Sequence, residues 1–157
     1  MSVFAANPHD PVIVRAHDAE LLPEIGHLLL ADASASNGAL SAHRIQLARG
    51  AGGAVPHRHD RSSELFFIVD GALELLVGSQ IITAGSGDLL VVPRRHDHAF
   101  RAAPTSTADA LIVITPGVER FDYLRQVARI RRGEADRDSL LTEQDRYDTH
   151  FVTSPVW

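Results

Sequence analysis

The sequence has 157 residues and contains no cysteine, which excludes disulfides, thiolate nucleophiles and cysteine-ligated zinc or iron–sulfur centres. Its formal net charge of −5 argues against general binding to nucleic acid or to anionic membranes. No apolar run approaches the roughly 20 residues that span a bilayer, and no basic and apolar leader opens the chain. We therefore expect a single, soluble, cytoplasmic domain.

The N-terminal third predicts a polar arm followed by three strands. Residues 1–10 form the arm, and the small, polar stretch 32–38 predicts a turn. Glycines at three positions within 49–53 predict a loop after the last of these strands. The strands are predicted from short apolar and β-branched runs at Pro11–Ala16, His27–Ala31 and Ala39–Leu47.

Strand patterns follow one another closely between residues 64 and 115. Asp70-Gly71 separates two of them and predicts a tight hairpin, while Gly78-Ser79 and residues 85–88 predict further turns. The gaps are too short for the crossover helices of a parallel sheet, so the pattern predicts an antiparallel sandwich or barrel. The predicted strands are Glu64–Val69, Ala72–Val77, Gln80–Thr83, Leu89–Val92, His98–Ala102 and Ala110–Thr115.

After residue 117 the apolar residues recur at the spacing of a helix and no longer at that of a strand. Phe121, Leu124 and Ala128 share one helical face, and Gly133 is placed to end that helix. No repeat or linker divides the chain, so we expect the helices to pack on the sheet. The predicted segments are a helix at Val118–Arg132, a second at about Ser139 to Asp148, and an apolar tail at 151–157 that docks on the body.

A histidine-rich pattern lies before the fourth predicted strand. His57 and His59 are one residue apart, so on an extended strand both side chains point to the same face. Glu64 follows shortly after and His98 lies further along the chain. A lone histidine pair more often lies exposed on the surface or is hydrogen-bonded in the core. Three imidazoles and one carboxylate are instead a ligand set for a divalent first-row metal, and they leave two positions of an octahedral ion open.

The two blocks that contain these residues resemble the two motifs of the cupin superfamily. The spacing between the blocks is that of compact members, and the flanking strands extend the resemblance over most of a single barrel. The first motif is carried by His57, His59, Glu64 and Gly71, and the second by Gly87, Pro93 and His98.

Three positions depart from the family pattern. Ala51 and Arg95 stand where the family has glycines, and Ala102 stands where it has an asparagine. All three positions concern turn geometry or local hydrogen bonding, and none removes a metal ligand.

The resemblance implies one all-β cupin domain over residues 1–157. Its double-stranded β-helix, or jelly-roll barrel, is expected at about 11–116. Short C-terminal α-helices are expected at about 118–157. The register of the second motif selects His98 rather than His96 as a ligand, with His96 at the rim or in the pocket. The implied ligands of one divalent transition metal ion (Fe, Ni, Mn, Co, Cu or Zn) are His57, His59, Glu64 and His98.

Further residues are candidates for catalysis and for the substrate pocket. Glu64 is the candidate catalytic residue, because a metal-bound carboxylate can also move a proton. His43 shares a strand face with Ile45 and Leu47, so it is either a hydrogen-bonded core histidine or a substrate contact. The candidate pocket residues, with core packing as the alternative, are His43, Phe66, Leu75, Phe100 and Val113.

The resemblance implies metal-dependent catalysis on a small-molecule substrate. We expect first a dioxygenase of the quercetin 2,3-dioxygenase type, which cleaves a flavonol or related enol with O₂ at a 3-His-1-Glu centre. The alternatives are a non-oxidative isomerase, cyclase or decarboxylase of the polyketide-tailoring type, or a non-catalytic cupin that binds a small molecule. We expect neither a nucleic-acid nor a membrane partner, and we expect a homodimer that covers exposed sheet edges.

Overall fold

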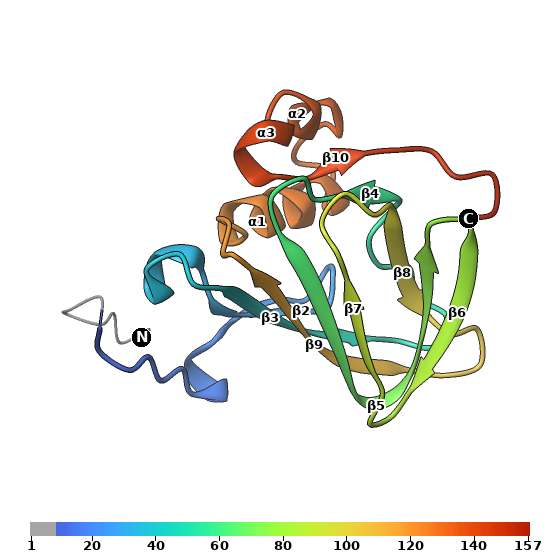
Figure 1. The fold of residues 1–157 in the computed structure, drawn as a ribbon, viewed down its shortest axis with the longest axis horizontal. Coiled ribbons are helices and arrows are strands. Elements are labelled where there is room, and N and C mark those ends of the chain that lie inside the picture. The colour runs from blue at the N-terminus through green and yellow to red at the C-terminus, as the bar shows by residue number, and fades with distance from the viewer. Residues whose placement is uncertain (1–8) are drawn as a thin grey trace.

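The computed structural model describes residues 9–157, so the polar arm expected at 1–10 lies almost entirely outside the described residues. Within that range the strands pair antiparallel in the order β1-β2-β3-β9-β5-β8-β4-β10, with β6 and β7 also paired to β5 (Figure 1). The sheet folds over into the predicted jelly roll without closing into a full ring. The strands are β1 (Glu20–Leu22), β2 (His27–Ala31), β3 (Ser41–Leu47), β4 (His57–Arg58), β5 (Ser63–Val77), β6 (Gln80–Gly85), β7 (Leu89–Val92), β8 (His98–Ala102), β9 (Ala108–Thr115) and β10 (His150–Phe151).

The long strand β5 replaces two predicted strands. It runs from Ser63 to Val77 without interruption, so the hairpin predicted at Asp70-Gly71 is wrong. The first half of β5 pairs with β7 and β9, and the second half pairs with β6 and β8. A register shift between Ile68 and Asp70, and the φ of 74° at Gly71, turn the strand from one half of the fold into the other. The Asp-Gly pair therefore marks a corner of the jelly roll.

The strand predicted at Pro11–Ala16 is also wrong. Residues 11–15 do not form a strand, and Ala16–Asp18 forms a short 3-10 helix. The strand that reaches the edge of the sheet is β1, which places Leu22 opposite His27 in β2. An apolar run without a neighbouring strand has no partner for its backbone hydrogen bonds, so its β-propensity alone does not make it a strand. The other predicted strands from His27–Ala31 to β9 lie within two residues of their observed ends.

Alternate residues of the central strands form the core, as expected for strands with one buried face. Phe66 is fully buried and meets Phe100 edge-on, with 5.5 Å between ring centroids. Ile45, Leu75 and Ile112 are also fully buried in this cluster. Burial of these side chains is the main stabilising contribution of the barrel.

The outer face of β5 and β7 carries exposed apolar side chains, among them Phe67, Leu89 and Val91. The homodimer expected from the sequence stays a prediction. None of the helices in residues 9–157 has the length and apolar character needed to cross a lipid bilayer.

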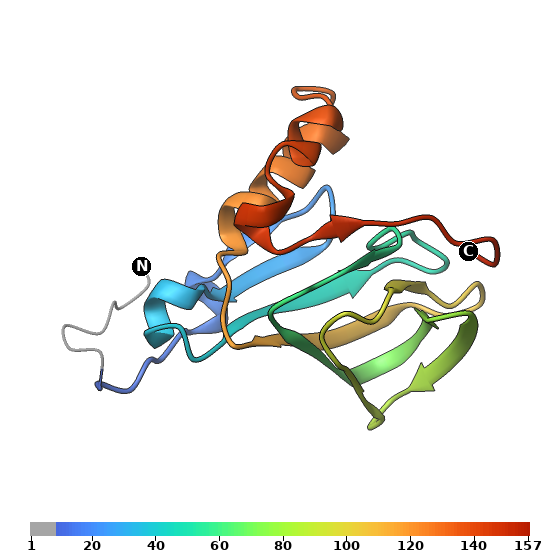
Figure 2. The same cartoon turned by 45° about the horizontal axis from the view of Figure 1, so that its top comes forward.

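The C-terminal segment gathers at one end of the barrel (Figures 1 and 2). Helix α1 (Phe121–Arg131) buries Leu124 and Ala128 against β1 and β2, and Gly133, with φ of 76°, follows its end as predicted. The carboxylate of Asp32 accepts hydrogen bonds from the backbone N–H groups of Arg120 and Phe121 at the start of α1.

The second predicted helix is interrupted. It consists of two single turns, α2 (Asp138–Leu141) and α3 (Gln144–Tyr147), separated at residues 142–143. Asp148 follows with a left-handed φ of 49°, and the chain then returns as β10 to pair with β4. The interruption lets the segment bend back onto the strand that carries His57.

Candidate metal centre

Three different elements bring the four predicted metal ligands together. His57 lies on β4 directly opposite His98 on β8, and Glu64 lies on β5. His59 follows the end of β4, so the pair does not share one strand as expected. All four side chains are buried, with no more than 3% of each residue exposed. His96 is exposed and lies outside the group.

The side chains converge on one carboxylate oxygen. The Nε2 atoms of His98, His59 and His57 lie 2.6, 2.9 and 4.0 Å from Oε2 of Glu64. One ligand atom from each of the four residues lies within 4.8 Å of the others. Ligand atoms about 2.1 Å from a metal ion and at right angles to one another are roughly 3 Å apart. The separations therefore fit donors around a single ion.

Backbone carbonyls hold the other ring nitrogen of each histidine. Nδ1 of His57 lies 2.7 Å from the Val55 carbonyl oxygen, and Nδ1 of His98 lies 2.9 Å from that of His96. Nδ1 of His59 lies 2.5 Å from the carbonyl oxygen of Asp148. A carbonyl only accepts, so each Nδ1 carries the proton and, in a neutral imidazole, Nε2 presents its lone pair to the centre. This arrangement is typical of histidines that bind a metal.

The electrostatics also favour a bound cation. Burial alone would raise the pKa of Glu64, but hydrogen bonds and charge from His59 and His98 outweigh it and hold that pKa well below its usual range. Burial lowers the pKa of His98, yet the hydrogen bond and charge of Glu64 outweigh it and the pKa is raised. Burial, followed by the charges of His98 and His59, lowers the pKa of His57. A divalent ion bound between the three Nε2 atoms and the Glu64 carboxylate would take the place of the protons in these hydrogen bonds.

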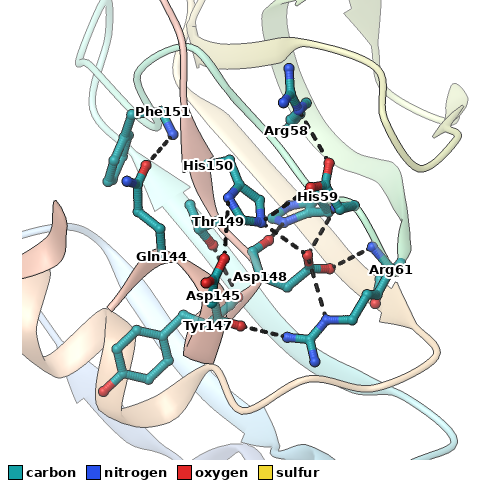
Figure 3. Close-up of polar contacts among 12 residues, drawn as sticks. Arg58, His59, Arg61, Gln144, Asp145, Tyr147, Asp148, Thr149, His150 and Phe151 are labelled. Carbon is teal, nitrogen blue, oxygen red and sulfur yellow. Dashed lines mark hydrogen bonds and ion pairs between the residues drawn. The ribbon is translucent and has the colours of Figure 1, made fainter. Parts of the chain in front are cut away.

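His59 is held by the C-terminal segment, as Figure 3 shows. Asp148 is 1% exposed, and its carboxylate accepts hydrogen bonds from the backbone N–H groups of Asp60 (2.9 Å) and Arg61 (3.0 Å). Its own carbonyl oxygen is the partner of His59 Nδ1. The loop that carries His59 is therefore fixed at three points by one residue, which the sequence motifs did not identify.

A cavity of about 520 Å³ opens beside the ligand group. Two ligands, His57 and Glu64, line it, together with two predicted pocket residues, His43 and Phe100. Sequence reasoning missed further lining residues. They include His27, Arg120 and Tyr123.

The other predicted pocket residues lie elsewhere. Phe66 and Leu75 are fully buried in the core, which was the alternative for them. Val113 is half-buried and lies on the face of β9 opposite to Ile112 and Ile114, which are fully buried. The expectation that Val113 lines the pocket is not met. A continuous apolar run gave no indication of which residues of this strand face inward.

His27 and His43 stack in the cavity wall, with 5.3 Å between ring centroids and 15° between ring planes. Burial lowers the pKa of His27 from 6.5 to about 4, against a smaller opposing effect from its bond to the Ile25 carbonyl. Burial also lowers the pKa of His43 well below 6.5, as does the charge of His27. Both rings are therefore neutral near pH 7.

We expect acid to destabilise the protein through His27. Between pH 6.5 and 4 the unfolded chain binds a proton at His27 that the folded chain excludes, so stability falls as the pH drops through that window. The full contribution is about 3 kcal/mol. Urea unfolding at pH 7, 5.5 and 4.5 checks it, with His27→Gln as the control that lacks the titrating group. Parallel pH profiles of the two proteins would contradict the prediction.

One departure from the family motif has a conformational consequence. Arg95, at the glycine position after Pro93, has a left-handed φ of 66°. Its backbone N–H donates to the carbonyl oxygen of His59 at 2.6 Å, so this turn also supports the ligand loop. A left-handed φ costs a residue with a side chain about 1–2 kcal/mol.

Arg95→Gly is expected to raise the free energy of unfolding by roughly 0.5–1 kcal/mol, because relief of the left-handed strain exceeds the entropy that glycine loses on folding. The neighbouring Arg94 has no positive φ, and Arg94→Gly is expected to lower stability. Urea denaturation of both variants measures the difference. Equal losses in the two variants would show that Arg95 is not strained.

Comparison with known proteins finds a cupin domain within the chain. Residues 43–114 match the family model described as the cupin domain, and this range contains all four ligand residues. Solved cupin structures share the fold. Residues 43–114 therefore form a segment that matches the cupin domain, as the two motifs predicted. No curated protein matches the chain by sequence.

Three solved structures illustrate the likeness. An RmlC-like cupin from Shewanella frigidimarina is 24% identical, with a TM-score of 0.59 over 73% of this chain and 96% of that one. The polyketide cyclase RemF from Streptomyces resistomycificus is 19% identical, with a TM-score of 0.56 over 68% of this chain and 80% of its own. Pac13, a nucleoside dehydratase from Streptomyces, is 17% identical, with a TM-score of 0.54 over 68% and 83% of the two chains. At these identities the likeness shows the fold alone, and neither named enzyme is described as a dioxygenase.

Proposed function

We propose that this cupin is a metal-dependent enzyme that removes a proton from a small substrate bearing an enol, phenol or enolisable carbonyl group. The observation that supports this most directly is that the buried His-His-Glu-His group opens into a cavity of about 520 Å³. A divalent ion held by His57, His59, Glu64 and His98 would polarise a substrate oxygen and lower its pKa. The side chains around the ion are proposed to accept the proton and to bind the substrate.

Glu64 is proposed as the proton acceptor. Its Oε2 atom faces the three histidines, while Oε1 makes no hydrogen bond within residues 9–157. The low pKa keeps the carboxylate ionised at neutral pH. Glu64 lines the cavity, so its free oxygen can take a proton from a bound substrate.

The neutral rings of His27 and His43 are proposed to bind and orient substrate oxygens. His27 donates from Nδ1 to the Ile25 carbonyl and therefore offers Nε2 as an acceptor. Nδ1 of His43 is buried without a partner. Because burial keeps their pKa values low, both rings act as hydrogen-bonding groups and not as strong bases.

Two reactions are compatible with this arrangement. Oxygen-dependent cleavage of the quercetin 2,3-dioxygenase type is supported by the two positions that four ligands leave open on an octahedral ion. A non-oxidative isomerisation, cyclisation or decarboxylation is supported by the polar cavity wall of His27 and His43, which orients a carbonyl substrate without any co-reactant. Dependence on O₂ separates them.

The test uses metal-free protein reconstituted separately with Fe, Mn, Co, Ni, Cu or Zn. Quercetin is supplied in air and under argon, and 1,3-dicarbonyl compounds are supplied in D₂O under argon, where NMR follows exchange of the acidic C–H. Quercetin consumed only in air supports the dioxygenase, and exchange or conversion under argon supports the non-oxidative reaction. Glu64→Gln should abolish either activity. A metal-loaded protein with neither activity in these assays would contradict the proposal and favour a binding cupin.

A further inference from the structure

Arg120 is a buried cation in the wall of the cavity beside the metal centre. The residue directly precedes α1 and is 5% exposed. Its Nη1 donates to Oγ1 of Thr149 at 2.6 Å and to the carbonyl oxygen of Tyr147 at 3.3 Å. The ring of Tyr123 covers one face of the guanidinium, with 4.2 Å between its centroid and Cζ. The side chain is therefore fixed in one orientation.

The other edge of the guanidinium lacks a charged partner. Nε of Arg120 is buried and makes no hydrogen bond, and no carboxylate within residues 9–157 forms an ion pair with the guanidinium. Buried charges in proteins are normally paired, because an unpaired charge loses its hydration without compensation. The Nε and Nη2 donors point the same way and form the planar fork that grips an oxyanion with two parallel hydrogen bonds.

The charges around the cavity also favour an anion. With a divalent ion bound, three neutral imidazoles and the Glu64 carboxylate leave a net charge of about +1, and Arg120 adds another. Glu24 and Arg131 also line the cavity, and their opposite charges cancel. His27 and His43 are neutral and do not oppose an anion. The cavity is thus positive, although the protein as a whole carries a net charge of −5.

We propose that Arg120 recognises a carboxylate of the substrate, so that the enzyme acts on a small organic acid. The carboxylate pairs with the part of the guanidinium that lines the cavity, while a second oxygen group of the same molecule reaches the centre formed by His57 and Glu64. This inference rests on the proposed function, and it narrows the substrate from any enolisable compound to an anionic one.

The test compares benzoate with benzamide, which have the same shape and differ in charge. Affinities are measured by ligand-observed NMR on metal-loaded and on metal-free protein. Benzoate is expected to bind about tenfold to a hundredfold more tightly than benzamide in both forms. Arg120→Gln should remove this preference, and Arg120→Lys should retain part of it. The matched control is Arg131→Gln, because Arg131 also lines the cavity but is exposed. The Arg131→Gln protein should prefer benzoate over benzamide as strongly as the wild type does.

The outcomes separate a binding role from a structural one. A purely structural Arg120 would change the stability of the variants without changing the preference for charge. Wild-type protein that binds both probes equally, or Arg120→Gln protein that keeps the preference, overturns the inference. If Arg120→Gln does not fold, the inference is tested by two other results. These are the preference of the wild type for benzoate over benzamide and the partial retention of that preference in Arg120→Lys. A further outcome is a wild-type protein that binds no metal and still prefers benzoate, with this preference lost in Arg120→Gln. That result would support the role of Arg120 and contradict the proposed function.

Discussion

His98→Ala protein is expected to purify without stoichiometric metal, whereas His96→Ala protein keeps the metal content of the wild type. His98 is 1% exposed and its Nε2 lies 2.6 Å from Oε2 of Glu64, while His96 is exposed and contributes only its backbone carbonyl. The loss of affinity should exceed the roughly 10–100-fold that removal of an outer-shell partner costs. Elemental analysis after dialysis, followed by titration with Co²⁺ or Zn²⁺, measures it.

The pair of variants also tests the register of the second cupin motif. The two histidines are two residues apart, and only the position five residues after Pro93 belongs to the motif. Metal lost from His96→Ala and retained in His98→Ala would reverse the assignment. Metal retained at full affinity in both variants would show that the centre does not need this strand.

The second large effect is expected at Asp148, which touches no metal. Asp148→Asn keeps the size of the side chain and tolerates the left-handed φ of 49°, but it removes the charge and one of the two acceptors. One of the N–H groups of Asp60 and Arg61 then loses its partner. We expect a loss of about 1–3 kcal/mol in the free energy of unfolding and about 10–100-fold weaker metal binding, because the loop of His59 is no longer fixed.

Asp145→Asn is the matched control. Asp145 lies three residues earlier in the same segment, and its side chain is fully exposed. Urea unfolding and metal titration of both variants measure the two effects. Asp148→Asn protein with unchanged metal affinity would show that the contact with the His59 loop does not support the centre.

The grouping of the four candidate ligands was predictable because each is fixed by its distance along the chain from a motif residue. His57, His59 and Glu64 lie within one short block, and the pairing of β4 with β8 then places His98 opposite His57. The same spacing excludes His96 from the ligand set, since it lies only three residues after Pro93. Short strands between glycine turns likewise predicted the antiparallel fold.

The supporting residues could not be predicted in this way. Asp148 follows His59 by 89 residues. Arg120 was predicted within the helix Val118–Arg132 but outside its buried face, and it directly precedes the observed helix. Neither residue belongs to a local pattern, since its role depends on how the C-terminal segment folds back over the barrel. The corner at Asp70-Gly71 was predicted wrongly for a related reason: a positive φ at glycine serves a hairpin and a bent strand equally well, and only the neighbouring strands decide.

The return of β10 to β4 bears on the order of events during translation. All four ligands leave the ribosome before Asp148 has been synthesised. On the proposed function, a nascent chain can therefore capture a metal ion while the loop of His59 is still untethered, and such an ion exchanges readily with the cellular pool. Docking of residues 144–151 fixes the loop of His59 and would slow that exchange. The C-terminal segment would thus act on the retention of a metal ion and not on its first binding.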